Sequence, residues 1–156
     1  MVSEYRPCVV VVFTNESGKI LACERSDHRG AWQLPQGGIE PGESALNAVY
    51  REMREELGCD RFKITGEASG LIKYRFPEEL NTKIAKKWIG QSQTWFKAEF
   101  DRGFMPDLTA ADGEFISTDW RDAGDVVEQI IDWKRDAYIE GLTKLGFKIN
   151  HKGGAG

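Results

Sequence analysis

The spacing of apolar residues along the chain changes from segment to segment, and these changes predict its strands and helices. Residues 6–13 form a nearly continuous apolar, β-branched run, which is typical of a buried strand. Asn15, Ser17 and Gly18 then supply turn-forming side chains. Residues 19–24 are predicted as a second strand, so residues 6–24 are expected to form a hairpin.

A helical period begins after residue 41. Residues 32–39 contain Pro35 and a glycine pair, and they predict a short strand that runs into a loop. The next apolar residues are spaced by three, four and four positions, as on one face of a helix: Leu46, Val49, Met53 and Leu57. Ser44 is the expected N-terminal cap, and Gly58 is the expected left-handed residue that ends the helix.

The remainder of the chain alternates between predicted strands, loops and a helical end. Strands are predicted at residues 62–74, 89–100 and 114–120, loops at 77–88 and 106–113, and one or two helices at 125–145. Strands that flank a central helix and precede a C-terminal helix favour an α/β sandwich with a mixed sheet. We expect a single domain over residues 1–147 and a flexible tail over residues 148–156.

Composition narrows the class of protein. The chain has 156 residues, of which 40% are hydrophobic, and its 21 basic and 25 acidic residues give a net charge of −4. This balance argues against a non-specific nucleic-acid binder held by phosphate contacts alone. The apolar runs are too short to cross a membrane, and no signal peptide is predicted.

Cysteine and histidine usage points away from zinc and disulfides. The three cysteines are widely separated, no CxxC pair occurs, and the chain has only two histidines. Reduced thiols in a cytoplasmic protein are the simplest interpretation. A Ser–His–Asp or Cys–His nucleophile arrangement is also not expected with so few histidines.

Three carboxylates share one face of the predicted central helix. Glu52, Glu55 and Glu56 are spaced i, i+3 and i+4, so like charges are brought together. A divalent cation would compensate these charges, and carboxylate oxygens suit Mg²⁺, with Mn²⁺ as a substitute. The alternative for these residues alone is an ordinary solvated acidic helix face.

The wider sequence around these glutamates follows a defined pattern. Residues 37–59 match G-x5-E-x7-R-E-U-x-E-E-x-G-U, where U is apolar, at every fixed position. This segment resembles the Nudix box. The glycines Gly37, Gly38 and Gly42 allow a sharp loop and a close approach of backbone to phosphate, and Arg51 can hold a carboxylate, for which Glu43 is a candidate.

The resemblance extends from residue 5 to residue 138. Segments at 5–7, 32–38, 89–96, 114–115 and 133–136 are similar to bacterial RNA pyrophosphohydrolases and the related dinucleoside polyphosphate hydrolases. The resemblance implies a Nudix-type α/β/α sandwich with a mixed β-sheet, a catalytic loop–helix–loop and a C-terminal helix. It also implies a set of metal ligands, namely Glu52, Glu55, Glu56, Glu114 and the backbone carbonyl of Gln36.

Catalytic and substrate-binding roles are likewise implied by the resemblance. Arg51 joins the four glutamates as a catalytic residue, and the general base is left open among Glu52, Glu55 and Glu114. The expected substrate-binding residues are Arg6, Arg25, Gly37, Gly38, Tyr74, Gln91, Gln93 and Lys134. Trp133 is interpreted either as a core contact or as a base-stacking residue. The other tryptophans considered, Trp32, Trp95 and Trp120, are expected in the core.

A local basic segment could recognise a polyanion. Residues 73–97 carry six basic side chains against two acidic ones: Lys73, Arg75, Lys83, Lys86, Lys87 and Lys97. This segment is either a steering surface for RNA or a solvated loop.

The leading functional hypothesis is a metal-dependent hydrolase that removes pyrophosphate from the 5′-triphosphate end of RNA. The alternatives are a hydrolase of Ap4A-like dinucleoside polyphosphates, a (deoxy)nucleoside triphosphate pyrophosphohydrolase, and a non-catalytic module that binds nucleotides or RNA ends. The expected partner is therefore 5′-triphosphorylated RNA or a nucleoside polyphosphate. Neither a membrane nor an obligate protein partner is expected, and the oligomeric state stays open.

Overall fold

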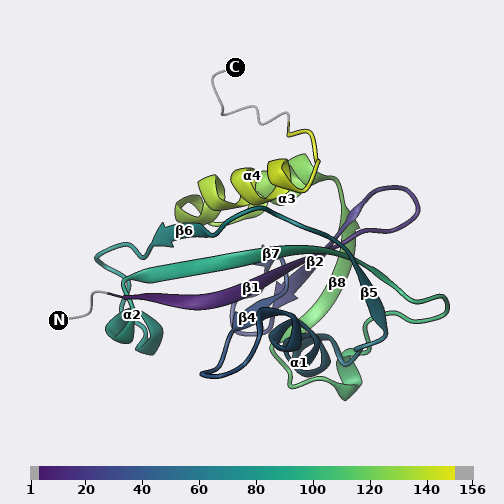
Figure 1. Cartoon of the computed structure of the whole chain (residues 1–156), viewed down its shortest axis with the longest axis horizontal. Helices are drawn as coiled ribbons and strands as arrows, with labels where there is room; N and C mark the ends of the chain where they lie inside the picture. Colours follow the sequence, from purple (N-terminus) through teal and green to yellow (C-terminus); the bar gives the residue numbers. More distant parts are fainter. Residues whose placement is uncertain (1–3, 150–156) are drawn as a thin grey trace.

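Two β-sheets and the helices packed against them make up the structure, a computed structural model that describes residues 4–149 (Figure 1). Two single-turn 3₁₀ helices, at Leu108–Ala110 and Asp132–Lys134, are called η1 and η2. The elements in chain order are β1 (Tyr5–Phe13), β2 (Ile20–Arg25), β3 (Trp32–Gln33), β4 (Gln36–Gly38), α1 (Ala45–Leu57), β5 (Phe62–Glu67), β6 (Ile72–Arg75), α2 (Lys83–Lys87), β7 (Gly90–Phe100), η1, β8 (Phe115–Arg121), α3 (Ala123–Gln129), η2 and α4 (Arg135–Lys144).

The larger sheet is mixed, as the sequence predicts. Its strands run in the order β4-β1-β7-β5, and β6 also pairs with β7. The central pair is parallel and in continuous register, from Tyr5 opposite Gly90 to Phe13 opposite Ala98. The other three pairings are antiparallel. A smaller antiparallel sheet has the order β3-β2-β8.

The predicted hairpin over residues 6–24 is wrong. A turn does form, because the Asn15 side chain accepts hydrogen bonds from the backbone N–H groups of Ser17 and Lys19, both at 3.0 Å. However, β1 already has β4 on one edge and β7 on the other. The second strand therefore leaves after a single bridge between Thr14 and Ile20 and enters the smaller sheet.

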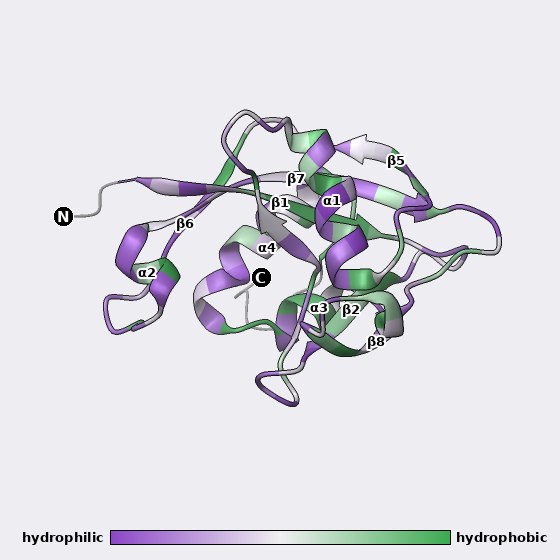
Figure 2. Ribbon diagram, turned by 90° about the horizontal axis from the view of Figure 1, so that it is seen from below, coloured by the Kyte–Doolittle hydropathy of each residue, from purple (hydrophilic) through white to green (hydrophobic). Residues whose placement is uncertain are grey.

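Alternate residues of β1 belong to two separate hydrophobic clusters. Val9 and Phe13 pack in the cluster that contains α1 and parts of the smaller sheet. Val10 and Val12 pack in the cluster that contains residues of α3 and α4. The sheet is thus covered by helices on both faces, which is the α/β/α arrangement that the sequence predicts (Figure 1). Figure 2 shows hydrophobic residues along β2 and β8 and mainly hydrophilic ones in α2 and the outer loops.

Both ends of α1 are capped as predicted. The Ser44 hydroxyl accepts a hydrogen bond from the Asn47 backbone N–H at 3.1 Å. Gly58 ends the helix in the left-handed conformation with φ of 65°. The buried face is rotated from the predicted one, because Leu46 is 47% exposed while Glu56 is only 2% exposed.

Two other predicted elements differ in detail, and the helical end agrees with its prediction. The predicted strand at 62–74 is interrupted and forms β5 and β6, which both pair with β7. The predicted loop at 77–88 contains α2, whose first turn is capped by the Thr82 hydroxyl. The predicted helical end forms α3 and α4. Most of the predicted tail, residues 150–156, lies outside the described residues.

None of the helices within residues 4–149 is long and apolar enough to cross a membrane.

Gly141 in α4 tests how closely the helix packs on the sheet. A Cβ atom at this position would lie 2.3 Å from the Trp95 ring. We expect Gly141→Ala to lower the free energy of unfolding by about 1–3 kcal/mol through overpacking, in spite of the higher helix propensity of alanine. Gly124→Ala in α3 is the matched control, because a Cβ there meets open space. Urea denaturation of both variants measures the effect, and equal stabilities would contradict the close packing.

Candidate active site

A cleft of about 700 Å³ lies at the end of the larger sheet that carries β4, and α1, β6, β7 and η2 contribute to its walls. Most of the site residues predicted from the sequence line this cleft. They are Arg6, Arg25, Gln36, Gly37, Gly38, Glu52, Glu56, Tyr74, Gln91, Glu114 and Lys134. Three selected residues, Arg51, Glu55 and Gln93, are not among the residues that line it.

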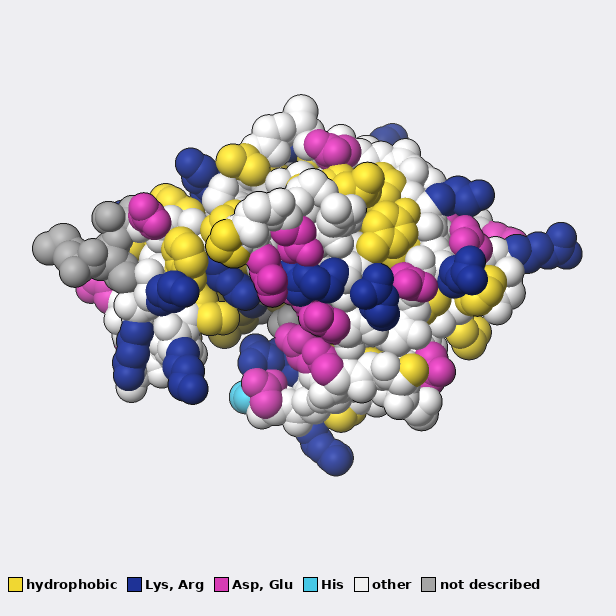
Figure 3. Space-filling model, turned by 60° about the horizontal axis from the view of Figure 1, so that its bottom comes forward, with side chains coloured by type: hydrophobic (Ala, Val, Ile, Leu, Met, Phe, Trp, Pro, Cys, Tyr) yellow, Lys and Arg dark blue, Asp and Glu magenta, His cyan; other side chains and the backbone are white. Residues whose placement is uncertain are grey.

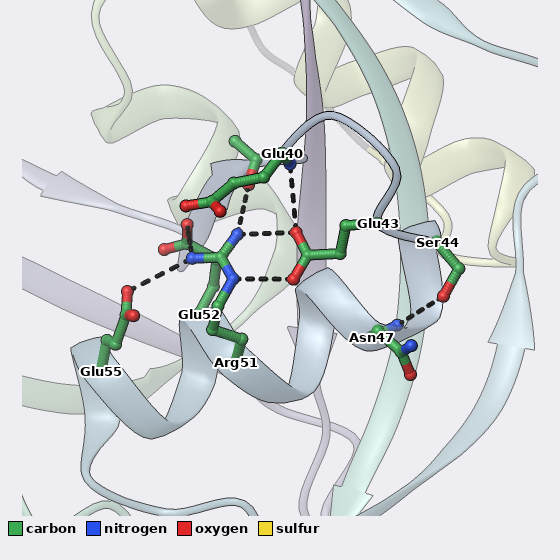
Figure 4. A network of polar contacts seen from close by, with 8 residues as sticks. Glu40, Glu43, Ser44, Asn47, Arg51, Glu52 and Glu55 are labelled. Atoms are coloured by element: carbon green, nitrogen blue, oxygen red, sulfur yellow. Dashed lines mark hydrogen bonds and ion pairs between the residues drawn. The ribbon is translucent and has the colours of Figure 1, made fainter.

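Arg51 does not line the cleft, but it organises the acidic residues of and before α1 (Figure 4). Its guanidinium donates to both carboxylate oxygens of Glu43, at 2.8 Å each, as the sequence suggests. It also donates to the Gly38 carbonyl at 2.8 Å, to Glu52 at 2.9 Å and to Glu55 at 3.4 Å. The hydrogen bonds from Arg51 lower the pKa of Glu43 to about 2. Arg51 therefore joins the glycine loop to α1 and orients Glu52.

Two glycines of β4 let side chains lie directly against the backbone. A Cβ atom on Gly37 would lie 2.0 Å from the Glu52 carboxyl carbon. A Cβ atom on Gly38 would lie 2.5 Å from an Arg6 guanidinium nitrogen. Since contacts this short do not occur, any larger residue would displace Glu52 or Arg6 from the cleft.

The carboxyl group of Glu56 is buried without enough partners. Its side chain receives a backbone hydrogen bond from Gln36, yet its Oε1 atom has no hydrogen-bond partner in the described part of the chain. Burial, followed by the negative charges of Glu114 and Glu52, raises the pKa of Glu56 well above its ordinary value. Glu52 and Glu56 are close enough to share a proton.

The two neighbouring carboxyl groups are perturbed in the same direction. Desolvation is the main cause of the raised pKa of Glu52, and it is also the main cause at Glu114, where Asp112 and Glu52 add repulsion. Raised pKa values at three neighbouring acids mean that the folded chain by itself holds negative charge poorly here.

A divalent cation fits this donor set. The unpartnered Glu56 oxygen and the adjacent Glu52 and Glu114 carboxylates are hard ligands that a cation would satisfy and neutralise. Within residues 4–149, no group of three or more acidic, histidine or cysteine side chains lies close enough together to hold a metal ion, so these carboxylates would have to draw together around a cation. Among the predicted metal ligands, Glu55 is the one that does not line the cleft. Its side chain is 48% exposed and forms an ion pair with Arg51.

Aromatic residues form part of the cleft wall. Trp133 packs against Tyr74 and Phe76, with ring centres 5.6 and 6.0 Å apart. Trp32 also lines the cleft, and the Arg121 guanidinium lies 3.9 Å from its ring centre.

The tryptophan predictions were partly right. Trp95 is fully buried, as expected. Trp120 is partly buried against the core. Trp32 is half-buried at the cleft rather than in the core. Its strand has only two residues, so periodicity gave no signal for which way the ring faces.

Two cationic side chains complete the cleft wall near η2. Lys134 lies 5.2 Å from the Trp133 ring centre, and burial together with the Arg25 charge lowers its pKa to about 8. Arg25 donates to Asp27 at 2.8 Å. Both cations can meet an anionic ligand, although Arg25 already has a carboxylate partner.

The buried carboxyl group gives a prediction about stability. An unfolded glutamate ionises near pH 4.3, whereas Glu56 in the fold resists ionisation, so the metal-free protein loses stability as pH rises above that value. We expect Glu56→Gln to raise the free energy of unfolding of the metal-free protein by about 1–3 kcal/mol near pH 7. The difference should shrink toward pH 4. Denaturation curves in EDTA at several pH values measure it.

The exposed Glu67 of β5 supplies the control for this experiment. Glu67→Gln should leave both the stability and its pH dependence unchanged. If Glu56→Gln changed neither the free energy of unfolding nor its pH dependence, as expected for the control, then burial of the Glu56 carboxyl group would not destabilise the metal-free protein.

Comparison with known proteins places this cleft in a family. The NUDIX domain model matches residues 4–140. The chain is 34% identical over 160 residues to Nudix hydrolase 25 of Arabidopsis thaliana, covering 97% of this chain and 91% of that protein. It is 35% identical over 148 residues to an RNA pyrophosphohydrolase of Rhodospirillum rubrum, covering 93% and 90%. A protein of the same name from Roseobacter denitrificans is 38% identical over 141 residues, with 86% and 88% covered.

Solved structures agree at the level of the fold. The dihydroneopterin triphosphate pyrophosphohydrolase of E. coli superimposes with a TM-score of 0.66 at 21% identity, covering 87% of this chain and 95% of that one. The Ap4A hydrolase of C. elegans gives 0.60 at 17% identity, covering 90% and 97%. The chain belongs to the Nudix hydrolase family, whose enzymes hydrolyse phosphoanhydride bonds.

Proposed function

We propose that this Nudix hydrolase is a metal-dependent RNA pyrophosphohydrolase that removes pyrophosphate from the 5′-triphosphate end of RNA. The observation that carries the proposal is the meeting, in one cleft, of the partly buried Glu52 and the buried Glu56 carboxyls with the cationic Arg6 and Lys134. The two bacterial relatives named RNA pyrophosphohydrolase support the choice of RNA.

Glu52 and Glu56 would hold the metal, with Glu114 and the Gln36 carbonyl as further ligands. Bound there, a divalent cation such as Mg²⁺ supplies charge neutralisation for phosphate oxygens and lowers the pKa of water. Arg51 keeps Glu52 in place by its hydrogen bonds to Glu52 and the Gly38 carbonyl. It acts as a positioning residue, since it does not line the cleft.

Arg6 is the strongest candidate for binding the phosphate chain. It lies on β1 against Gly38, so its guanidinium reaches the glycine loop that leads into α1. A guanidinium matches two oxygens of a phosphate and remains charged at all working pH values. Lys134 faces the same cleft and would add a second positive charge as pyrophosphate develops in the reaction.

The position of each glutamate relative to the cleft reduces the candidates for the general base from three to two. Glu52 and Glu114 line the cleft, whereas Glu55 does not. We assign the removal of a proton from the attacking water to Glu52 or Glu114, because a base must reach the reacting atoms.

Recognition of RNA is assigned to the basic residues of α2. Thr82 and Ile84 line the cleft, so the lysines of α2 lie next to it. Within residues 4–149, Lys83, Lys86 and Lys87 form no ion pair with a carboxylate. Figure 3 shows basic side chains at the left end of the molecule, where α2 lies, beside acidic side chains near the centre.

Ap4A-like dinucleotides are the second candidate substrates. The cluster of Tyr74, Phe76 and Trp133 offers aromatic surface on which a base could stack. A free nucleotide or dinucleotide would bind to this aromatic cluster and would not contact the lysines of α2. Replacing those lysines should therefore affect RNA but not Ap4A.

A substrate competition tests the proposed function. With Mg²⁺, we expect 5′-triphosphorylated RNA to be converted to monophosphorylated RNA faster than Ap4A, GTP or dGTP is cleaved.

Replacing the three α2 lysines by alanine should raise KM for RNA about tenfold at low salt and leave KM for GTP unchanged, because each lysine would contact only the RNA backbone. The control replaces Lys19, Lys63 and Lys148 by alanine, because these three lysines lie outside residues 73–97 and do not line the cleft. Preference for Ap4A or GTP with no effect of the lysines would contradict the choice of RNA.

The proposed metal ligands predict a loss of hydrolysis both in the Glu56→Gln variant and in wild-type protein treated with EDTA. Glu56→Gln should lose at least about 100-fold in kcat at saturating Mg²⁺, since it removes a ligand charge, yet remain folded. Excess EDTA should abolish wild-type hydrolysis while circular dichroism stays unchanged. Wild-type turnover by Glu56→Gln, or hydrolysis that persists in EDTA, would refute the metal role.

A further inference from the structure

A network of buried side-chain amides ends at the cleft floor. We call Gln36, Gln91, Gln93 and Trp95 the amide network. The Trp95 indole donates to Gln93 Oε1 at 2.9 Å. The Gln93 amide nitrogen in turn donates to Gln91 Oε1 at 2.9 Å and to Gln36 Oε1 at 3.2 Å. Gln93 and Gln91 are only 1% and 4% exposed, so these bonds are made away from bulk water.

The direction of every bond in the network is fixed by its first donor. An indole N–H can donate but cannot accept, so Gln93 must turn its oxygen toward Trp95. The amide nitrogen of Gln93 then has two N–H groups, and these donate to Gln91 and Gln36. Gln91 and Gln36 must therefore turn their oxygens inward, which leaves their N–H groups for other partners.

Two members of the network lie at the cleft and two lie behind it. Gln36 and Gln91 line the cleft, whereas Gln93 and Trp95 do not. In the described part of the chain, the amide nitrogens of Gln91 and Gln36 donate no hydrogen bond to protein, and neither is a fully buried unpartnered atom. Both nitrogens are thus available to a ligand.

The neighbours of Gln91 identify the kind of ligand. Gln91 lies directly opposite Arg6 in the register of β1 and β7, and both side chains line the cleft. Amide N–H groups beside a guanidinium place several donors side by side, which suits the oxygens of a phosphate. A glutamine turned the other way would present a carbonyl oxygen and repel the same phosphate.

We propose that Trp95, acting through Gln93, is a positioning residue that keeps the N–H groups of Gln91 and Gln36 facing the cleft, where they bind phosphate oxygens of the substrate. The inference rests on the proposed function, which places phosphates in this cleft. It assigns a role in substrate binding to a fully buried tryptophan that no substrate touches.

Reversal of the network is the most direct test. In Gln93→Glu, the carboxylate accepts from Trp95 and also from Gln91, so Gln91 turns its oxygen toward the cleft. We expect the dissociation constant for inorganic pyrophosphate with Mg²⁺, measured by isothermal titration calorimetry, to rise about 10- to 100-fold. Trp95→Phe frees Gln93 without reversing it, and we expect a rise of about three- to tenfold.

Tyr138→Phe is the matched control for disturbance of the core. The Tyr138 ring packs edge-on against Trp95 with 5.5 Å between ring centres, and its hydroxyl accepts from the Leu34 backbone. This variant loses one buried hydrogen bond in the same cluster but leaves the amide network intact. Its affinity for pyrophosphate should stay within about twofold of wild type.

A double-mutant cycle separates polarity from general damage. Gln91→Met removes the N–H groups that the network orients, so Gln93→Glu should cost less affinity in that background than in wild type. If Gln93→Glu does not fold, as thermal unfolding would show, the comparison of Trp95→Phe with Tyr138→Phe decides.

Two results would overturn the inference. One is that Gln93→Glu and Trp95→Phe bind pyrophosphate as tightly as Tyr138→Phe, and the other is that wild type does not bind pyrophosphate. Failure of wild type to hydrolyse triphosphorylated RNA would instead refute the proposed function, because the pyrophosphate comparison does not require that substrate.

Discussion

The burial of the Glu56 carboxyl group is the constraint on which the rest of the site depends. A carboxyl group that is 2% exposed, with one oxygen unpartnered in the described chain and two acidic neighbours, is costly to keep there. The elements around Glu56 are held in place by hydrogen bonds, which keep its carboxyl group buried. Both ends of α1 are capped, and Arg51 ties the helix to the loop that precedes it. Such a site gains stability when a cation enters, so binding and stability are coupled.

The cleft is lined by groups of opposite character. Acidic oxygens come from α1 and the loop before β8, and hydrogen-bond donors come from β1 and β7. A phosphate chain bridged by cations has the complementary pattern, with shared positive charge on one side and free oxygens on the other. The amide network fits this division, because its one donor-only member fixes two glutamines as donors.

Sequence periodicity and capping predicted α1 and the mixed sheet, because these depend on local chemistry. The apolar pattern could not show that Leu46 would be exposed and Glu56 buried, since the two positions lie only about 80° apart around the helix axis. The pattern also could not show that both edges of β1 are already paired, with β4 and β7, because these strands come from later parts of the chain. No edge of β1 is therefore left for β2. Glu55 shares a helical face with Glu52 in the sequence, but Glu55 does not line the cleft and forms an ion pair with Arg51. Trp95 and Gln93 were found in sequence only as a core residue and a substrate contact, because hydrogen-bond direction exists only in three dimensions.

Anomalous diffraction from crystals soaked in Mn²⁺ tests the metal site most directly. We expect a strong anomalous peak within coordination distance of the Glu52 and Glu56 carboxylates, with the Glu56 Oε1 atom among the ligands. A map in which Mn²⁺ binds elsewhere, or in which Glu56 stays protonated and uncoordinated at saturating Mn²⁺, would contradict the assignment of this cleft as the catalytic metal centre.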